Sequence, residues 1–134
     1  MKGILIFITT AVIATVSTTT ISTKLASRRI KYRSFSNEMI PSCIVVDCTH
    51  AHNKQITHHL KYSHQKSLSL DINQLGDSTT DSVLNIIKNS MSKLYEFDYV
   101  TSNHFDIDSF LSTWCIVNAD IALQYEEVLR SIAW

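Results

Sequence analysis

Two short apolar runs constrain the fold of this chain most strongly. Residues 43–46 (CIVV) and 99–101 (YVT) have the length and β-branched content of buried strands. Apolar residues at helical spacing follow each run, first Val83, Ile86, Ile87, Met91 and Leu94, then Phe110, Leu111, Trp114 and Cys115. The order strand, helix, strand, helix predicts a βαβ unit with a right-handed crossover and two parallel strands. We therefore expect an α/β fold with a small parallel sheet and flanking helices.

Local signals place the other segments. Ser78 with Asp81 three residues later is a capping pair typical of a helix start. Residues 118–120 indicate a break before a second apolar helical stripe, formed by Ile121, Tyr125, Val128, Leu129 and Ile132. The polar segment 49–70 predicts a loop, in which residues 67–70 alternate like a short edge strand.

An uncharged apolar segment, residues 4–21, precedes this alternating part. It is compatible with a signal peptide, with an anchor that contacts the membrane, with an organelle transit peptide, or with a non-native extension. A membrane-anchored or secretory location is favoured, and a mitochondrial or other organelle location is the alternative. The residue before a proline is pushed toward extended geometry, so Pro41 marks the predicted boundary between a leader, residues 1–40, and an α/β domain, residues 41–134.

Charge and cysteine content exclude some classes of protein. The net charge is zero, but residues 1–37 carry six of the 12 basic residues and no acid, so the remainder is acidic. An acidic body argues against nucleic-acid binding, which needs clustered Lys and Arg. The three cysteines form no CxxC pair, and their odd number predicts reduced thiols rather than a disulfide framework.

A dense polar segment, residues 103–109 (NHFDIDS), lies between the second apolar run and its helix. Parallel strands end on one edge of a sheet, where open α/β sheets build ligand and metal sites. The predicted topology gathers Asp47, His50, Asp77, Asp81, His104, Asp106 and Asp108 at that edge. Carboxylates with one or two imidazoles suit Mn²⁺, Mg²⁺, Zn²⁺ or Fe²⁺. We predict that the metal ligands are Asp47, His104, Asp106 and Asp108, with His50, Asp77 and Asp81 as accessory residues.

Simpler interpretations stand beside this one. Asp77 and Asp81, like Asp106 and Asp108, are also explained as helix caps that oppose the positive end of a helix. The histidines at 52 and 64 are typical of isolated surface residues. His58 and His59 are accessory candidates, because a loop that crosses the sheet edge would lower an imidazole into the site, where it would contact phosphate.

Several runs resemble a family of uncharacterised domains. They are residues 45–50 (VVDCTH), 57–59 (THH), 76–85 (GDSTTDSVLN) and 101–114 (TSNHFDIDSFLSTW), and the resemblance extends over residues 43–134. The family has Asp-Gly where this chain has Asp108-Ser109 and continues past the last helix, so the resemblance implies a shortened member with an unrelated leader.

A more remote similarity connects the chain with the DHH-type metal phosphoesterases. Those enzymes hold Mn²⁺ with a His-x-x-Asp-x-Asp-like motif between a parallel strand and a helix. Here residues 104–108 (HFDID) are one residue tighter, and the Asp-His-His triplet is absent. A likeness at the level of fold carries little weight for function.

Three functional hypotheses follow. The first is a metal-dependent hydrolase acting on a small phosphorylated substrate, or a degenerate relative of one. The second is a non-catalytic domain, membrane-tethered or partner-binding, with an uncovered apolar stripe through Trp114, Tyr125, Ile132 and Trp134. The third is a fragment without independent activity. The chain has no Gly-x-Ser-x-Gly motif, phosphate-binding glycine loop or dinucleotide fingerprint, which argues against the common hydrolase, nucleotidase and dehydrogenase routes.

Overall fold

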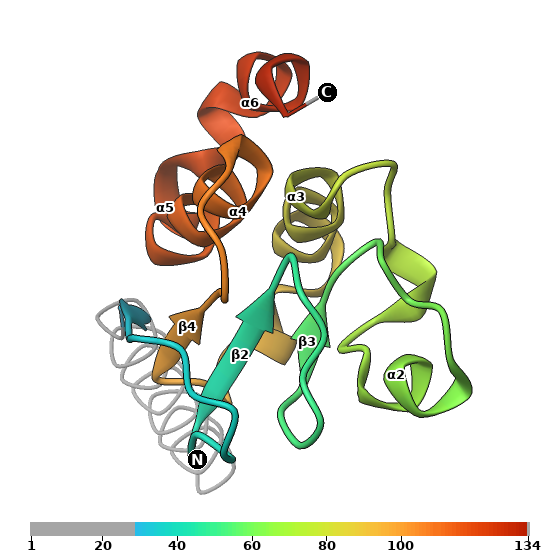
Figure 1. Ribbon diagram of the computed structural model, residues 1–134. Helices are drawn as coiled ribbons and strands as arrows, with labels where there is room; N and C mark the ends of the chain where they lie inside the picture. The colour runs from blue at the N-terminus through green and yellow to red at the C-terminus, as the bar shows by residue number, and fades with distance from the viewer. Residues whose placement is uncertain (1–28, 134) are drawn as a thin grey trace, which may run out of the picture.

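The apolar run at residues 43–46 forms β2 (Cys43–Val46), an inner strand of a four-stranded parallel sheet (Figure 1). The computed structural model describes residues 29–133. Across the sheet the order is β1 (Lys31–Tyr32), β4 (Tyr99–Thr101), β2 and β3 (Gln55–Ile56). The fold is therefore α/β, as the alternation of strand and helix predicts.

The described part of the chain forms five α-helices, and all but the first, polar one follow the apolar stripes of the sequence. They are α2 (Ser63–Leu68), α3 (Thr79–Ser90), α4 (Ile107–Val117), α5 (Ala119–Ala122) and α6 (Glu126–Ile132), with 3₁₀ turns η1 (Ile72–Gln74), η2 (Met91–Leu94) and η3 (Leu123–Tyr125). Ser78 caps α3, because its hydroxyl accepts a hydrogen bond from the Asp81 amide at 3.1 Å. Asn118 ends α4 and precedes α5, which confirms the predicted break.

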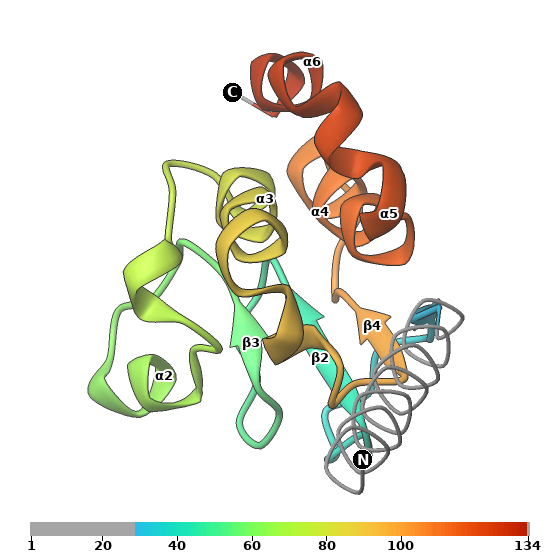
Figure 2. The same cartoon turned by 180° about the vertical axis from the view of Figure 1, so that it is seen from behind.

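The hydrophobic core joins the sheet to α3 and α4, which lie side by side in both views (Figures 1 and 2). Ile44 and Val46 of β2 pack in one cluster with Val83 of α3 and Leu111 of α4. The other two residues of β2 are buried as well, so this strand is covered on both faces. Burial on both faces explains why its sequence is continuously apolar rather than alternating.

The first strand lies within the range that the sequence assigned to the leader. Lys31 and Tyr32 of β1 pair with Tyr99 and Val100 of β4, and Ile30 is buried in the core. The folded domain therefore begins before Pro41. Both β1 residues are exposed, so the strand is held by backbone pairing and leaves no apolar signal.

The polar segment after β2 is more ordered than a loop. It contains β3 and α2, and α2 lies beside β3 on the side of the sheet away from α4 and α5 (Figures 1 and 2). Residues 67–70 were expected as an edge strand, but Ser67 and Leu68 end α2 and only Ser69 forms an isolated bridge with Gln55. The strand prediction for this segment is wrong, because Ser67 and Leu68 belong to the helix and the Ser69 amide donates to the Lys66 carbonyl in the turn that ends it.

Side-chain contacts join the last helix, α6, to α3, among them those of Arg130 and the ion pair between Lys88 and Glu126 at 3.1 Å. Arg130 donates hydrogen bonds to Asp81 at 2.8 Å, to Asn85 at 2.9 Å and to Glu126 at 2.9 Å. Asp81 is buried, and a buried charge without a partner is strongly destabilising. The ion pair with Arg130, from a distant part of the sequence, compensates this charge.

Within residues 29–133, no helix is long and apolar enough to cross a membrane. The apolar segment 4–21 lies outside the described residues.

Candidate metal centre

Asp47 lies at the centre of the carboxyl edge of the sheet. It directly follows β2, its side chain is 2% exposed, and its backbone φ of 55° is in the left-handed region. Aspartate tolerates this conformation better than most residues, because its short side chain forms local hydrogen bonds. The amide of Asp47 still donates to Ile56 of β3 at 3.0 Å, so the turn that aims the carboxylate is fixed to the sheet.

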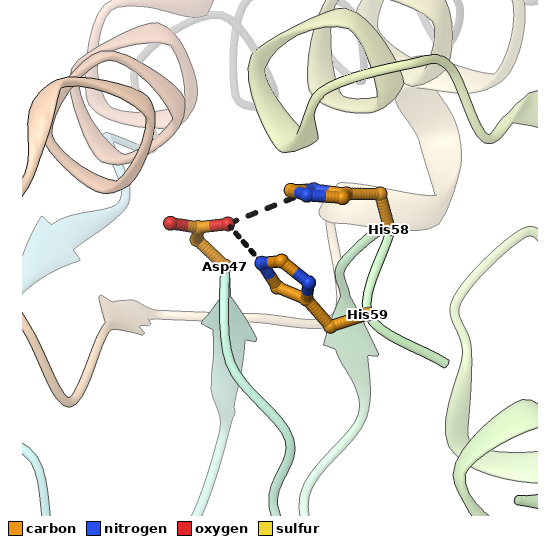
Figure 3. Close-up of side chains that lie close together, drawn as sticks. All are labelled: Asp47, His58 and His59. Atoms are coloured by element: carbon orange, nitrogen blue, oxygen red, sulfur yellow. Dashed lines mark ion pairs between the residues drawn. The ribbon is translucent and has the colours of Figure 1, made fainter. Parts of the chain in front are cut away.

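One oxygen of Asp47 faces two histidines that follow β3 (Figure 3). Oδ1 lies 3.8 Å from Nδ1 of His58 and 3.7 Å from Nε2 of His59. The same oxygen accepts a hydrogen bond from the Thr79 hydroxyl at 2.7 Å. The Thr79 oxygen is in turn 3.0 Å from Nδ1 of His58, so this threonine orients both the carboxylate and the ring.

The other oxygen of Asp47 faces the segment after β4. Oδ2 lies 3.0 Å from Nε2 of His104, and the same nitrogen lies 3.2 Å from Oδ2 of Asp106. Nδ1 of His104 lies 2.7 Å from Oδ1 of Asn103, which fixes the ring from its far side. A metal-ligating histidine normally has such a partner on its second nitrogen.

Asp106 has two functions, one for each oxygen. Its Oδ1 accepts a hydrogen bond from the Ser109 amide at 2.8 Å and so caps α4, as the simpler interpretation of the sequence proposed. Its Oδ2 remains directed at His104. The hydrogen bond from Ser109 is the main cause that lowers the pKa of Asp106, and His104 lowers it further.

Burial raises the pKa of Asp47 above the ordinary value of an aspartate. The hydrogen bond from Thr79 opposes this rise, whereas the nearby carboxylates of Asp108 and Asp106 add to it. A buried carboxylate close to two others is costly to ionise, and a bound cation would offset that cost.

Asp108 caps a helix, but not its own. Its Oδ2 accepts a hydrogen bond from the Thr79 amide at 2.8 Å, and its Oδ1 accepts from the Thr80 amide at 2.8 Å and the Thr80 hydroxyl at 2.6 Å. Asp108 lies in the first turn of α4. Both of its carboxylate oxygens therefore accept hydrogen bonds from the N-terminus of α3. Asp108 Oδ2 is 3.7 Å from Nδ1 of His58, so the residue borders the cluster without belonging to its close groups.

Three of the predicted accessory residues, His50, Asp77 and Asp81, lie outside the two ligand groups around Asp47. His50 is buried, with Nε2 2.9 Å from the Ser36 carbonyl and with Nδ1 accepting hydrogen bonds from the amides of His52 and Asn53, so its ring holds the loop after β2. Asp81 is paired with Arg130 on α6. Asp77 is exposed and belongs to neither ligand group that contains Asp47.

Two groups of three ligand-type side chains therefore share Asp47. The first is Asp47, His58 and His59, and the second is Asp47, His104 and Asp106; in each group the ligand atoms lie within 4.8 Å of one another. Three protein ligands of nitrogen and oxygen are typical of catalytic sites that keep positions open for water or substrate. Such mixed sets suit Zn²⁺, Mn²⁺ or Fe²⁺.

Sequence reasoning did not identify Thr79 and Asn103 as residues of this site. Both orient ligands rather than supply them. Thr79 is the first residue of a helix that begins at the carboxyl edge of the sheet, which is the only signal that the sequence contains for it.

Comparison with known proteins gives one match. A family model described as "Family of unknown function (DUF6687)" matches residues 28–134. This range includes β1 and every residue of the two ligand groups. No curated protein and no solved structure matches the chain.

Proposed function

We propose that this chain, which belongs to the family of unknown function DUF6687, is a divalent-metal-dependent phosphoester hydrolase. In this proposal Asp47 bridges two ions. His58 and His59 complete the ligands of one, and His104 and Asp106 complete the ligands of the other.

The observation that carries the proposal is the division of the Asp47 carboxylate. Its Oδ1 faces His58 and His59, and its Oδ2 faces His104. A carboxylate that presents a separate oxygen to each of two ligand groups is an arrangement suited to a pair of neighbouring metal ions, such as those that clamp a phosphoryl group. Neutral imidazoles and ionised carboxylates are the ligand forms, so binding would displace protons from this cluster.

The acidic charge of the cluster favours cations, and bound cations would in turn favour a phosphoryl group as the substrate's reacting part. The ion pairs of Asp47 among the described residues are with histidines, and its neighbours Asp106 and Asp108 are also acidic. An anionic phosphate would be repelled here unless cations intervene. Paired divalent ions in such sites activate water and stabilise the charge on a phosphoryl group.

The cluster is open to solvent on the side where a substrate would enter. The side chains of His59, His104 and Asp106 are 52%, 40% and 56% exposed, whereas Asp47 below them is 2% exposed. A buried bridging carboxylate beneath exposed ligands lets the chain hold ions rigidly and still admit a phosphoester.

The test is hydrolysis of p-nitrophenyl phosphate and bis(p-nitrophenyl) phosphate by the full chain, with Mn²⁺, Zn²⁺, Fe²⁺ or Mg²⁺ added to chelator-treated protein. We expect activity that depends on the metal, and a drop in kcat/KM of at least about 100-fold for Asp47→Asn. His64→Ala is the matched control, because it removes a histidine of α2 that stacks on Tyr62 and belongs to neither ligand group. Metal-independent hydrolysis, or none with any of the four ions, would contradict the proposal.

The C-terminal helices favour a second candidate function, the binding of a protein partner. Tyr125 and Ile132 are 54% and 46% exposed, on a face that the described part of the chain leaves uncovered. Sedimentation velocity tests it: a concentration-dependent increase in mass, lost in Tyr125→Ser with Ile132→Ser, would support this candidate, and a monomer at all concentrations would count against self-association.

A further inference from the structure

An apolar groove adjoins the candidate metal centre. Its volume is about 380 Å³, and it lies between β1 and the face of α4 that begins at Ser109 and ends at Val117. His104 lines this groove, and the same ring lies 3.0 Å from Asp47. The groove therefore opens directly beside the ligands.

Aromatic side chains dominate the groove. Tyr32, Phe105, Phe110 and Trp114 line it, and the rings of Phe105 and Phe110 meet edge to face with centroids 5.9 Å apart. Its lining contains no Asp, Glu, Lys or Arg side chain, and His104 is the single histidine in it. Such a surface matches an uncharged, flat group rather than a second phosphate.

The exposure of these rings points to a ligand. Phe105 is 86% exposed, Tyr32 59% and Phe110 45%. Each of these rings has apolar surface that a ligand in the groove would cover. Clustered exposed aromatics next to a polar site are typical of ligand-binding pockets, and the volume is within the usual range for small-molecule sites. Serine and threonine hydroxyls at positions 102, 109 and 113 add polar groups to the same lining.

We propose that the substrate is a phosphoester whose alcohol part carries a flat aromatic group, which lies in this groove while the phosphate lies at the Asp47 cluster. This inference rests on the proposed hydrolase function and names its substrate class. The aromatic group stacks on Phe110 and Trp114, and His104 lies at the junction between ring and phosphate. A nucleoside phosphate and a simple benzyl phosphate share this chemistry.

A comparison of leaving groups with similar alcohol chemistry tests the proposal. We expect kcat/KM of the metal-loaded full chain to be at least about fivefold higher for benzyl phosphate than for propyl phosphate, because one aromatic stacking contact changes affinity by about 5- to 150-fold. Adenosine 5′-monophosphate is the second arm: a further gain over benzyl phosphate assigns the ring to a nucleobase, and equal rates assign it to a simple aryl group. Equal rates for benzyl and propyl phosphate overturn the proposal while leaving hydrolysis intact.

Phe110→Ala shows whether the groove causes the preference. This variant is expected to lose the preference through a higher KM for benzyl phosphate, so that the ratio of kcat/KM for benzyl phosphate to that for propyl phosphate falls to about one. Ile72→Ala is the matched control, since Ile72 is 46% exposed, close to the 45% of Phe110, and lies on η1 outside the groove. A preference that survives in Phe110→Ala overturns the assignment to the groove.

A binding measurement separates this proposal from the hydrolase function. Trp134→Phe leaves Trp114 as the single tryptophan of the sequence. Saturable quenching of its fluorescence by adenosine or benzyl alcohol, lost in the additional variant Phe110→Ala, supports an aromatic site even if no phosphoester is hydrolysed. No quenching by either compound, in a protein that hydrolyses propyl phosphate, overturns the aromatic site alone.

Discussion

At the scale of single residues, Asp47 depends on a neighbour that is not a ligand. The Thr79 hydroxyl donates to Asp47 Oδ1 at 2.7 Å and lies 3.0 Å from the His58 ring. Thr79 is fully buried, so no water replaces this contact when it is removed. The hydroxyl at the start of α3 therefore helps to position both Asp47 and His58.

Thr79→Val removes that hydroxyl at nearly constant volume. We expect the free energy of unfolding to fall by about 1–3 kcal/mol, because Asp47 loses a buried hydrogen bond, and metal affinity to fall by about 10- to 100-fold. Urea unfolding and calorimetric metal titration measure the two effects. Thr79→Ser should restore both, and a valine variant with unchanged metal affinity would show that Thr79 does not position Asp47.

Part of this candidate site could be predicted from the Asp and His residues that follow the predicted strands. Asp47, His104 and Asp106 converge as expected, because parallel strands end on the same edge. His58 and His59, accessory candidates in the sequence, lie 3.8 Å and 3.7 Å from Asp47 Oδ1 and form the other ligand group with it. Asp81 could not be excluded from sequence alone, since its partner Arg130 is 49 positions away and only the packing of α6 on α3 joins them.

At the scale of elements, the N-terminus of α3 is held by α4. Asp108 accepts hydrogen bonds from the amides of Thr79 and Thr80, so the first turns of the two helices are joined beside the cluster. A carboxylate at a helix N-terminus also opposes the positive end of the helix dipole. This contact sets the position of Thr79 and, through it, of Asp47.

Asp108→Asn tests this connection. The amide can accept at only one position and brings an NH₂ group toward backbone donors, so we expect a loss of about 1–3 kcal/mol in the free energy of unfolding. Asp120→Asn is the control, because Asp120 is 66% exposed and its ion pair with Arg29 is long, at 4.0 Å. If both variants unfold at the same urea concentration as the wild-type chain, Asp108 is not a stabilising cap.

A second pair joins η1 to η2. Lys93 donates to Asp71 at 2.7 Å, and this hydrogen bond is the main cause that lowers the pKa of Asp71 below its ordinary value. A group with a lowered pKa in the folded state stabilises the fold above the unfolded pKa, and this contribution is lost as pH falls through the folded pKa.

Asp71→Asn should therefore lower the free energy of unfolding at pH 7 by up to about 1 kcal/mol, because Lys93 is half-exposed and screened by solvent. The difference from the wild-type chain should be constant between pH 7 and about 5 and shrink below about pH 4. Urea titrations at pH 7 and pH 3 measure it. A difference as large at pH 3 as at pH 7 would show that packing, not charge, is responsible.

The strands show what could be predicted at this scale. The strands β2 and β4 were predicted because they are apolar and central, whereas β1 and β3 have only two residues each, too few to show a pattern, although Ile56 of β3 is in the core. The polar sequence of α2 likewise has no buried face, which removes the periodicity that identifies a helix. Only contacts with the rest of the fold define such elements.

At the scale of the whole molecule, all three cysteines are buried and unpaired in the structure. Burial raises the pKa of Cys43 to about 11 and that of Cys115 to about 12, and it also raises the pKa of Cys48. The reactive thiolate is therefore scarce at neutral pH.

Thiol labelling should then report global unfolding. At pH 7.5 we expect the native chain to react slowly with a chromogenic disulfide reagent, and the chain in urea to react rapidly at three sites. Rapid labelling of the native chain would show that part of this core opens easily, and fewer than three reactive thiols in urea would reveal a disulfide.

The central claim, that Asp47 bridges two metal ions, is tested most directly by counting metals per chain. Full-length protein loaded with Mn²⁺ or Zn²⁺, freed of excess ion and analysed by elemental mass spectrometry should hold about two ions, because two ligand groups share Asp47. His104→Ala should retain about one, through His58 and His59, and Asp47→Asn should retain none. A wild-type chain without bound metal, or an Asp47→Asn variant that still holds two ions, would contradict the account.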